Sequence, residues 1–337
     1  MKRTKKINLL INLPPDTFAC PELRGIFKRL AAMAVVRRTS ANTPEEIVKD
    51  LPWADAVIMW SWPVLDAALL AKAPRLKFLG QLNSTQRTAR AAFKRGLPIS
   101  EARKGWSPAV AEMALTLMLA GLRKTSAYHI AMRAGTEEWV KSFPSGIDPR
   151  ERQLTGRAVG IVGFGGIGQR LAQLLAPFNV KLRVYDPFLP KAVAKQYGAQ
   201  LVPLMQLLRA SEIVVLCAAQ NKASERLIGP KQIQVLRKDC VLVNVSRASL
   251  IDMQALTSRL RKGDMTAMLD VFEHEPLETD APLRRMKNAF LTPHRAGGLM
   301  ESVQRLLTML VDDLEASLKG KPRKHVLTEA MLPSLPD

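Results

Sequence analysis

The stretch that decides the fold is Arg157–Asp186, which reads RAVGIVGFGGIGQRLAQLLAPFNVKLRVYD. An apolar run of strand type, residues 157–162, leads directly into the glycine-rich segment Gly163–Gly168. A helical pattern of apolar residues follows, and a second strand, residues 181–185, ends at an aspartate. A strand, a glycine-rich turn, a helix and a second strand of this total length form one βαβ unit, which predicts a dinucleotide-binding site.

Each residue type in this segment has a physical reason. Gly163 permits the tight turn out of the strand, and Gly165 lets the backbone approach a pyrophosphate. Gly168 lets the helix pack closely on the strand, so that free N–H groups at the helix start point at the phosphates. Asp186 at the end of the second strand can accept hydrogen bonds from the adenosine ribose. Because a carboxylate there repels a 2′-phosphate, we predict NAD rather than NADP as the cofactor.

The length and the cysteines limit the class of protein. A chain of 337 residues is expected to form two domains, each with its own core. The three cysteines, Cys20, Cys217 and Cys240, lie far apart in apolar segments, with no CxxC or Cys/His cluster. We therefore predict free thiols, a reducing compartment and no structural metal.

No segment is predicted to target or span a membrane. The basic start Met1–Lys6 precedes a short apolar run, residues 7–13, which is interrupted by asparagines and followed by no cleavage site, so a first β-strand is the better interpretation. The most apolar helix candidate, Pro108–Leu122, carries Glu112 and is expected to be too short to cross a bilayer. These features predict a soluble cytoplasmic protein with no membrane partner.

The net charge of +20 is high, and residues 1–108 hold 19 Lys and Arg against 8 Asp and Glu, an excess of +11. A solvated basic surface is the simplest explanation. Steering of anionic substrates and weak association with nucleic acid are the alternatives. Because no interleaved aromatic residues or nucleic-acid motif accompany the charge, we do not expect a nucleic-acid partner.

Strands and helices alternate along the whole chain, which predicts an α/β fold with parallel sheets covered on both faces. The predicted strands are residues 7–12, 34–38, 56–60, 76–82, 97–99, 157–162, 181–185, 212–218, 241–244, 266–269 and 289–291. The predicted helices are residues 22–33, 44–49, 64–72, 86–95, 108–122, 167–175, 204–209, 231–236, 252–261 and 299–319. Residues 133–153 are predicted to be irregular.

Two breaks divide this alternation into domains. At Gly105–Pro108, Ser107 is a candidate N-cap for a long, almost entirely apolar helix, which must be buried between domains or subunits. Gly297–Gly298 marks the second break. We expect two doubly wound parallel-sheet domains: a Rossmann NAD-binding domain, residues 107–298, inserted into a flavodoxin-like substrate-binding (catalytic) domain, residues 1–106 and 299–337. A cleft between two such domains is a usual place for a substrate.

Three further stretches follow predicted strands at the edge where open α/β sheets bind ligands. The first, VNVSRASLID, contains Arg247. The second, LDVFEHEPL, contains Asp270 and Glu275, and the third, LTPHRAGG, contains His294.

These motifs and the glycine-rich segment resemble the D-isomer-specific 2-hydroxyacid dehydrogenase family, which includes glyoxylate/hydroxypyruvate reductases, D-lactate dehydrogenases and phosphoglycerate dehydrogenases. The likeness covers nearly the whole chain and is strongest from Ser107 to Gly298. It implies that Arg247, Glu275 and His294 are the catalytic residues. It also implies that Asp270 holds the nicotinamide carboxamide.

The chemistry of these side chains fits the implied reaction. Arg247 can hold a 2-oxo acid carboxylate bidentately and polarise the carbonyl. His294 can donate a proton to the developing alkoxide, because histidine titrates near neutral pH. Glu275 would bond the far ring nitrogen and stabilise the imidazolium. Taken singly, each residue could instead be an ordinary surface or loop residue, whereas their occurrence together in order favours the catalytic interpretation. His274 fits no motif position and is interpreted as a neighbour.

The chain departs from the family pattern at several positions. Ala248 replaces the usual glycine after the arginine, Cys217–Ala219 replaces a common His-x-Pro, and Arg295 follows the histidine where an apolar residue is common. The glycine-containing loop for the substrate carboxylate is replaced by Leu82-Asn-Ser-Thr85, where backbone N–H groups near Asn83 and Ser84 can serve.

These observations predict an NAD-dependent oxidoreductase that interconverts a 2-oxo acid and a D-2-hydroxy acid, with a small acid as substrate and a homodimer as the assembly. The predicted substrate contacts are Asn83, Ser84, Arg247 and His294. The predicted cofactor contacts are Gly163, Phe164, Gly165, Gly166, Ile167, Gly168, Tyr185, Asp186, Pro187, Cys217, Ala218, Val245, Ser246 and Asp270. The alternative is a non-catalytic NAD(H)-sensing protein of the corepressor type found in this superfamily, which the basic first domain favours.

Overall fold

A computed structural model describes residues 6–336 of the chain. The structure divides into two compact units, one formed by Met1–Trp106 with Leu299–Asp337 and the other by Ser107–Gly298. Each unit is an α/β structure built on one parallel sheet, as the sequence predicts.

The sheet of the first unit has the strand order β2-β1-β3-β4-β5, and all neighbouring strands are parallel. This is the order of flavodoxin-like folds. The strands are β1 (Ile7–Asn12), β2 (Ala34–Thr39), β3 (Ala56–Met59), β4 (Phe78–Gln81) and β5 (Ile99–Glu101). Because β3 and β4 are buried at every residue, helices must cover both faces of this sheet.

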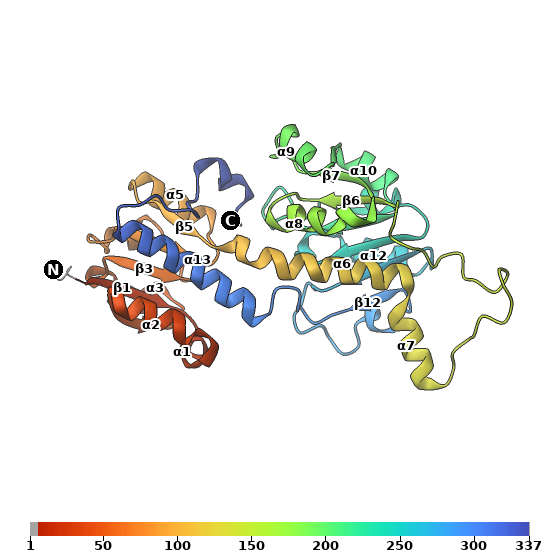
Figure 1. The fold of residues 1–337 in the computed structure, drawn as a ribbon, viewed down its shortest axis with the longest axis horizontal. Helices are drawn as coiled ribbons and strands as arrows, with labels where there is room; N and C mark the ends of the chain where they lie inside the picture. The colour runs from red at the N-terminus through yellow and green to blue at the C-terminus, as the bar shows by residue number, and fades with distance from the viewer. Residues whose placement is uncertain (1–5, 337) are drawn as a thin grey trace. The chain divides into compact units, whose positions relative to one another are not determined.

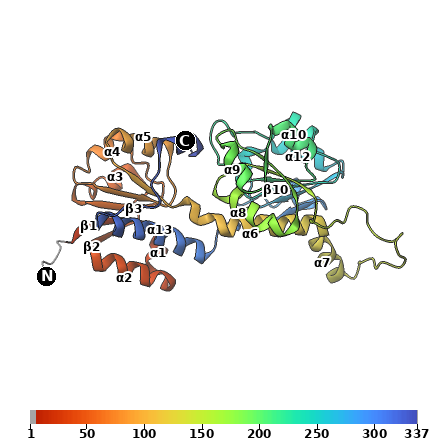
Figure 2. The same cartoon turned by 45° about the horizontal axis from the view of Figure 1, so that its top comes forward.

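Two groups of helices cover these faces, as Figure 2 shows. On one face α2 (Arg24–Met33) and α13 (Met300–Leu318) bury Leu30, Leu306 and Leu310 against the strands. On the other face lie α3 (Pro44–Ile47), α4 (Ala67–Ala71) and α5 (Gln86–Lys94), whose apolar residues form a second core cluster. The last long helix therefore packs on the first part of the chain.

The sheet of the second unit has the order β12-β11-β10-β9-β6-β7-β8, again entirely parallel. Its strands are β6 (Ala158–Val162), β7 (Lys181–Tyr185), β8 (Gln200–Leu201), β9 (Ile213–Leu216), β10 (Cys240–Asn244), β11 (Met265–Leu269) and β12 (Ala289–Leu291). The direction of winding reverses between β6 and β9. Such a switch point opens a crevice at the carboxyl ends of the strands, where open α/β sheets bind ligands.

The helices of this unit also form two layers. On one face α6 (Ser107–Arg123) packs against α8 (Gly166–Leu175) and against β10 and β11. On the other, α10 (Leu204–Ala210), α11 (Pro230–Gln234) and α12 (Met253–Leu260) bury their leucines over the sheet. After α7 (Thr125–Ala134) the chain has no helix or strand before β6 and projects as an extended loop in Figure 1.

The structure corrects several predicted boundaries. The helix predicted over 64–72 begins only at Ala67, because the Asp66 side chain accepts a hydrogen bond from the Leu69 N–H and acts as the N-cap. Ser107 is not an N-cap, since the 3-10 turn η3 (Arg103–Trp106) continues directly into α6. The strand predicted over 97–99 is shifted to Ile99–Glu101.

Three α-helices and one strand escaped the sequence analysis: α1 (Pro15–Ala19), α7, α9 (Lys191–Gln196) and β8. None of α1, α7 and β8 contains a buried residue.

The apolar helix is longer than predicted. Helical residues run from Arg103 to Arg123, and by length and composition this stretch is sufficient to cross a membrane, which corrects the expectation that it is too short. However, 44% of its most apolar window is buried inside the protein. Its contacts with α8 and the sheet show it as a core helix of its unit.

Candidate active site

The turn after β6 is shaped by glycines with two different roles. Gly163 has a positive φ of +87°, and a Cβ there would lie 2.4 Å from the backbone of Ala218. At Gly168 a Cβ would lie 2.5 Å from the carbonyl oxygen of Gly163. At Gly165, the residue before α8, an added Cβ would meet no atom within 4 Å. Packing thus explains Gly163 and Gly168, whereas Gly165 leaves open space beside the helix N-terminus, which suits a pyrophosphate.

Asp186 lies beside this turn at the end of β7. One carboxylate oxygen accepts the Phe164 N–H at 2.8 Å, and the other accepts the Phe188 N–H at 2.9 Å. These bonds fix the carboxylate next to the glycine-rich turn while leaving further lone pairs on both oxygens. Its position at the strand end fits the adenosine ribose of a dinucleotide.

The residues after β9 and β10 form the other wall of the switch point. Cys217 is buried, and burial raises the pKa of its thiol to about 12, so it stays a neutral apolar group. The Ser246 hydroxyl donates to the Ala218 carbonyl, which joins the two loops. Val245 is buried beside them.

A buried asparagine holds the arginine loop. Asn244, the last residue of β10, is fully buried; its Oδ1 accepts the Ser246 N–H at 3.1 Å and its Nδ2 donates to the Arg247 carbonyl at 2.9 Å. Arg247 is exposed, and its Nη1 donates to the Ser246 carbonyl at 2.7 Å. The charged group is therefore presented at the carboxyl edge of the sheet on a fixed backbone.

His294 and Glu275 form a hydrogen-bonded pair, with 2.7 Å between Nδ1 of the ring and Oε2 of the carboxylate. Burial acts to raise the pKa of Glu275, but the bond to His294 and the Phe272 N–H outweigh it, and the pKa lies below its ordinary value. The positive charge of Arg247 also lowers this pKa. The three residues predicted to be catalytic thus share one electrostatic environment.

Asp270 holds the chain on both sides of His294. This carboxylate is fully buried and accepts three hydrogen bonds, from the Thr292 hydroxyl, the Arg295 N–H and the Ala296 N–H. His294 has a positive φ of +50°, which is costly for a residue with a side chain. Asp270 therefore stabilises the strained turn that points His294 toward Glu275.

The predicted carboxylate loop lies in the first unit, after β4. Asn83 accepts a hydrogen bond from the indole N–H of Trp106 at 3.2 Å. The Ser84 hydroxyl is buried and donates to the Gln81 side chain at 2.8 Å. Of these two residues, Asn83 is therefore the more accessible one.

A titratable residue beside this loop escaped the sequence analysis. Glu101 at the end of β5 is 8% exposed, and burial raises the pKa of its carboxyl to about 7. Arg103 opposes this shift with its charge and its N–H, and the Ser84 N–H also faces the carboxylate. Three tryptophans, Trp60, Trp62 and Trp106, lie at the same edge of the sheet. In the sequence, the only signal for Glu101 and these tryptophans is that they lie at or after the ends of strands, and no motif marks them.

The geometry defines a dinucleotide-binding unit with a histidine–carboxylate pair and an arginine at its ligand edge. A family model for the D-isomer specific 2-hydroxyacid dehydrogenase NAD binding domain matches residues 115–296, more than half of the chain. The chain belongs to this family, and its second unit carries the family's NAD-binding domain.

Curated relatives are about 30% identical to this chain over the regions that align. It is 31% identical over 274 residues to a glyoxylate reductase from Aeropyrum pernix, covering 80% of this chain and 81% of that protein. It is 29% identical over 313 residues to a D-3-phosphoglycerate dehydrogenase from Methanocaldococcus jannaschii, covering 92% of this chain. The chain spans only 58% of that longer relative.

Solved structures have the same fold along nearly the whole chain. A phosphoglycerate oxidoreductase from Rhizobium etli superposes with a TM-score of 0.81 at 25% identity, covering 96% of this chain and 98% of that one. A 2-hydroxyacid dehydrogenase from Ketogulonicigenium vulgare gives 0.76 at 26% identity, covering 96% of this chain and 99% of that one.

Glu101 predicts a pH-dependent stability. Its pKa is about 4.5 in the unfolded chain and about 7 in the folded protein, so the folded state binds more protons between these values and stability falls as pH rises through this window. The glutamine of Glu101→Gln cannot ionise. Between pH 4.5 and pH 8 the free energy of unfolding of this variant should therefore rise relative to that of the original protein by on the order of 2–3 kcal/mol. Urea unfolding at a series of pH values measures this difference.

The matched control is Glu45→Gln, which changes an exposed carboxylate of the same unit and should give a difference that does not vary with pH. A Glu101→Gln protein that is destabilised equally at every pH would show that the ion pair with Arg103 outweighs the cost of burial.

Proposed function

We propose that this protein is an NAD-dependent oxidoreductase that interconverts a 2-oxo acid and a D-2-hydroxy acid. The observation that carries the proposal is the His294–Glu275 pair, with Arg247 close enough to lower the pKa of Glu275. This set lies at the carboxyl edge of the NAD-binding sheet. The names of the relatives, glyoxylate reductase and D-3-phosphoglycerate dehydrogenase, support the same class of reaction.

Each member of the set has a chemical role in this proposal. Arg247 binds the substrate carboxylate and polarises the adjacent carbonyl. NAD(H), when bound, supplies or accepts the hydride. His294 donates a proton to the developing alkoxide through Nε2, because Nδ1 is occupied by Glu275. In the oxidation direction neutral His294 accepts that proton, and Glu275 stabilises the imidazolium.

Asp270 acts on the reaction through the loop that it holds. Three of its hydrogen bonds go to residues 292–296, so it positions His294 directly. Because the buried Asp270 carboxylate already accepts these three hydrogen bonds, it is also a rigid acceptor. A remaining lone pair on it suits the nicotinamide carboxamide.

The substrate contacts of the first unit are assigned to the loop after β4. Asn83 is the residue of this loop whose side chain is partly exposed, and we assign it to the substrate carboxylate, with Ser84 contributing to the shape of the loop.

The catalytic role of His294 can be tested by NADH oxidation with glyoxylate, hydroxypyruvate, pyruvate, a branched-chain oxo acid and phenylpyruvate. His294→Ala removes the proton donor and should lower turnover by about 10²-fold or more while NADH still binds. His274→Ala is the matched control, because His274 lies beside Glu275 in sequence but is not its hydrogen-bond partner. It should retain turnover.

Equal turnover in His294→Ala and the original protein would remove His294 from the mechanism. Measurable NADH binding without turnover of any acid in the panel would contradict the enzymatic proposal and favour an NAD(H)-sensing role.

The preference for NAD over NADP is assigned to the Asp186 carboxylate, which repels a 2′-phosphate. Asp186→Asn removes the charge and keeps a carbonyl oxygen that can accept the Phe164 N–H, so the turn is preserved. The ratio of kcat/KM for NADH to that for NADPH should fall by about tenfold or more. An unchanged ratio would show that another group selects the cofactor.

We further propose that the protein is a homodimer and that α7 with the loop to Arg150 contributes to the interface. This arm exposes large apolar side chains, namely Ile130 at 66%, Met132 at 52%, Trp139 at 70%, Val140 at 62% and Phe143 at 83%. An exposed apolar patch of this kind marks an interaction surface, and homodimers are the commonest assemblies.

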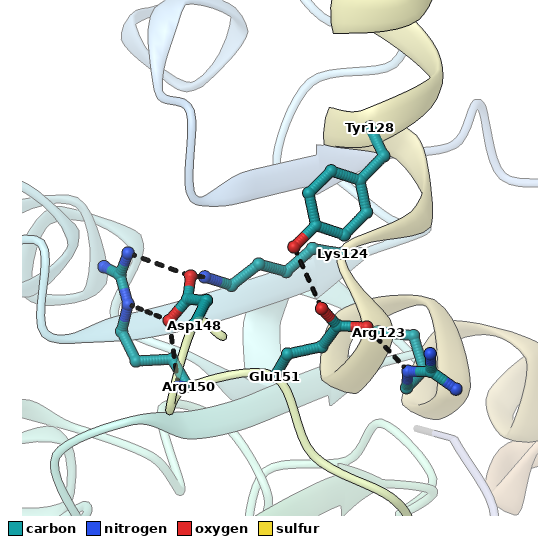
Figure 3. Close-up of polar contacts among 6 residues, drawn as sticks. All are labelled: Arg123, Lys124, Tyr128, Asp148, Arg150 and Glu151. Atoms are coloured by element: carbon teal, nitrogen blue, oxygen red, sulfur yellow. Dashed lines mark hydrogen bonds and ion pairs between the residues drawn. The ribbon is translucent and has the colours of Figure 1, made fainter. Parts of the chain in front are cut away.

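A charged cluster fastens the arm at its base, as Figure 3 shows. Asp148 pairs with Lys124 and Arg150, and the bonds from Arg150 and Lys124 hold the pKa of Asp148 well below its ordinary value. Glu151 accepts hydrogen bonds from Arg123 and Tyr128, both at 2.9 Å. The cluster fixes both ends of the arm, which favours an ordered protein interface.

The double change Trp139→Ser and Phe143→Ser should shift the dimer toward monomer, because it removes two large apolar contacts from the arm. Sedimentation velocity over a range of protein concentrations measures the shift. Phe188→Ser is the control, since Phe188 is 53% exposed and lies outside the arm. If the double variant and the Phe188→Ser control sediment with the same mass, the arm is excluded from the interface.

A further inference from the structure

Three of the five tryptophans of the chain form one stack in the first unit. The rings of Trp60 and Trp62 lie 5.3 Å apart at an interplanar angle of 8°, and those of Trp60 and Trp106 lie 6.0 Å apart at 9°. Trp60 is therefore the middle ring. Trp60 and Trp106 also pack against the core cluster beneath α2 and α13.

The stack lies at the ligand-binding edge of the first sheet. Trp60 and Trp62 follow β3, and the Trp106 indole N–H donates to Asn83 in the loop after β4. The tryptophan stack is thus hydrogen-bonded to the residue that we assign to the substrate carboxylate.

Buried polar side chains fix the backbone of the stack. Asn12 is 2% exposed and donates to the carbonyl oxygens of Trp62 and Ala41. Gln81 is fully buried and donates to the Trp60 carbonyl at 3.4 Å. With the backbone held by these bonds and the rings stacked on one another, little entropy is lost when a flat group packs on them.

The outer ring of the stack is accessible. Trp62 is 41% exposed although its backbone is anchored to a buried asparagine. A large aromatic side chain that is held in place and left in solvent offers apolar area and a π face to a ligand.

The charge of the protein narrows the kind of ligand. A π face can take either an aromatic ring or a cation. Residues 1–108 carry an excess of +11, a field that disfavours a cationic side chain and favours an acid. A substrate with a carboxylate at one end and a neutral aromatic ring at the other matches both features.

We propose that the Trp60–Trp62–Trp106 stack is a specificity platform and that this protein prefers 2-oxo acids with an aromatic side chain, whose ring packs on the exposed face of Trp62. This inference rests on the proposed 2-oxo acid reductase activity and names its substrate class.

The test compares phenylpyruvate with glyoxylate, which has no side chain to reach the platform. Trp62→Ala should lower kcat/KM for phenylpyruvate by about tenfold or more, mainly through KM, and change that for glyoxylate by less than about threefold. Trp62→Phe keeps an aromatic face and should restore most of the phenylpyruvate activity. Trp62→Leu keeps apolar volume without a π face and should not.

Trp53→Ala is the matched control, because Trp53 lies in the same unit, packs beside Arg37 and is outside the stack. It should leave the ratio of the two substrates unchanged. If Trp62→Ala does not fold, the comparison of Trp62→Leu with Trp62→Phe decides the question.

The outcomes separate this inference from the proposed function. Turnover of glyoxylate with no preference for phenylpyruvate, or a ratio insensitive to position 62, overturns the platform and leaves the reductase proposal intact. No turnover of any acid overturns the reductase proposal itself. A Trp62→Ala protein whose only change is a loss of dimer, measured by sedimentation, shows that the ring is a subunit contact and also overturns the platform.

Discussion

A fully buried carboxylate, Asp270, holds the part of the structure on which the candidate chemistry depends. A buried charge is costly unless hydrogen bonds satisfy it, and Asp270 accepts three of them from the loop of residues 292–296. The same bonds offset the strain of the left-handed His294 backbone, roughly 1–3 kcal/mol for such a residue. The 2.7 Å bond between His294 and Glu275 therefore starts from a histidine whose backbone is already placed.

The same arrangement recurs at the ligand edge of both sheets. Asn12, Gln81 and Asn244 are each the last residue of a strand and are at most 2% exposed. Asn12 and Gln81 hydrogen-bond to the loops that follow neighbouring strands, and Asn244 hydrogen-bonds to the loop that follows its own strand. Asn12 and Gln81 hold the tryptophan backbone, whereas Asn244 holds Arg247. Buried amides and carboxylates leave loops little freedom, because every alternative loop conformation would leave a polar group unsatisfied. The strands thus position the site through these side chains as well as through their ends.

The sequence predicted the fold well because alternating apolar segments and glycine-rich turns have strong local signals. The βαβ unit from Arg157 to Asp186 and the strand Ala289–Leu291 are found where they were expected. The pairing of Glu275 with His294 was expected from the family resemblance, and the hydrogen bond is present, although the catalytic roles stay predictions. Asn244 and Glu101 were missed, since their effect arises from burial in the folded protein, which no local pattern records.

The basic charge and the tryptophan stack act on different parts of the same substrate in our proposals. The net charge of +20 acts over a Debye length and attracts any small carboxylate, so it raises encounter rates without distinguishing one 2-oxo acid from another. The stack acts only on contact, through the flat face of Trp62, and distinguishes acids by their side chains. Added salt should therefore weaken the first effect for every acid alike, whereas the preference for an aromatic side chain should persist, because dispersion and apolar burial are not screened by ions.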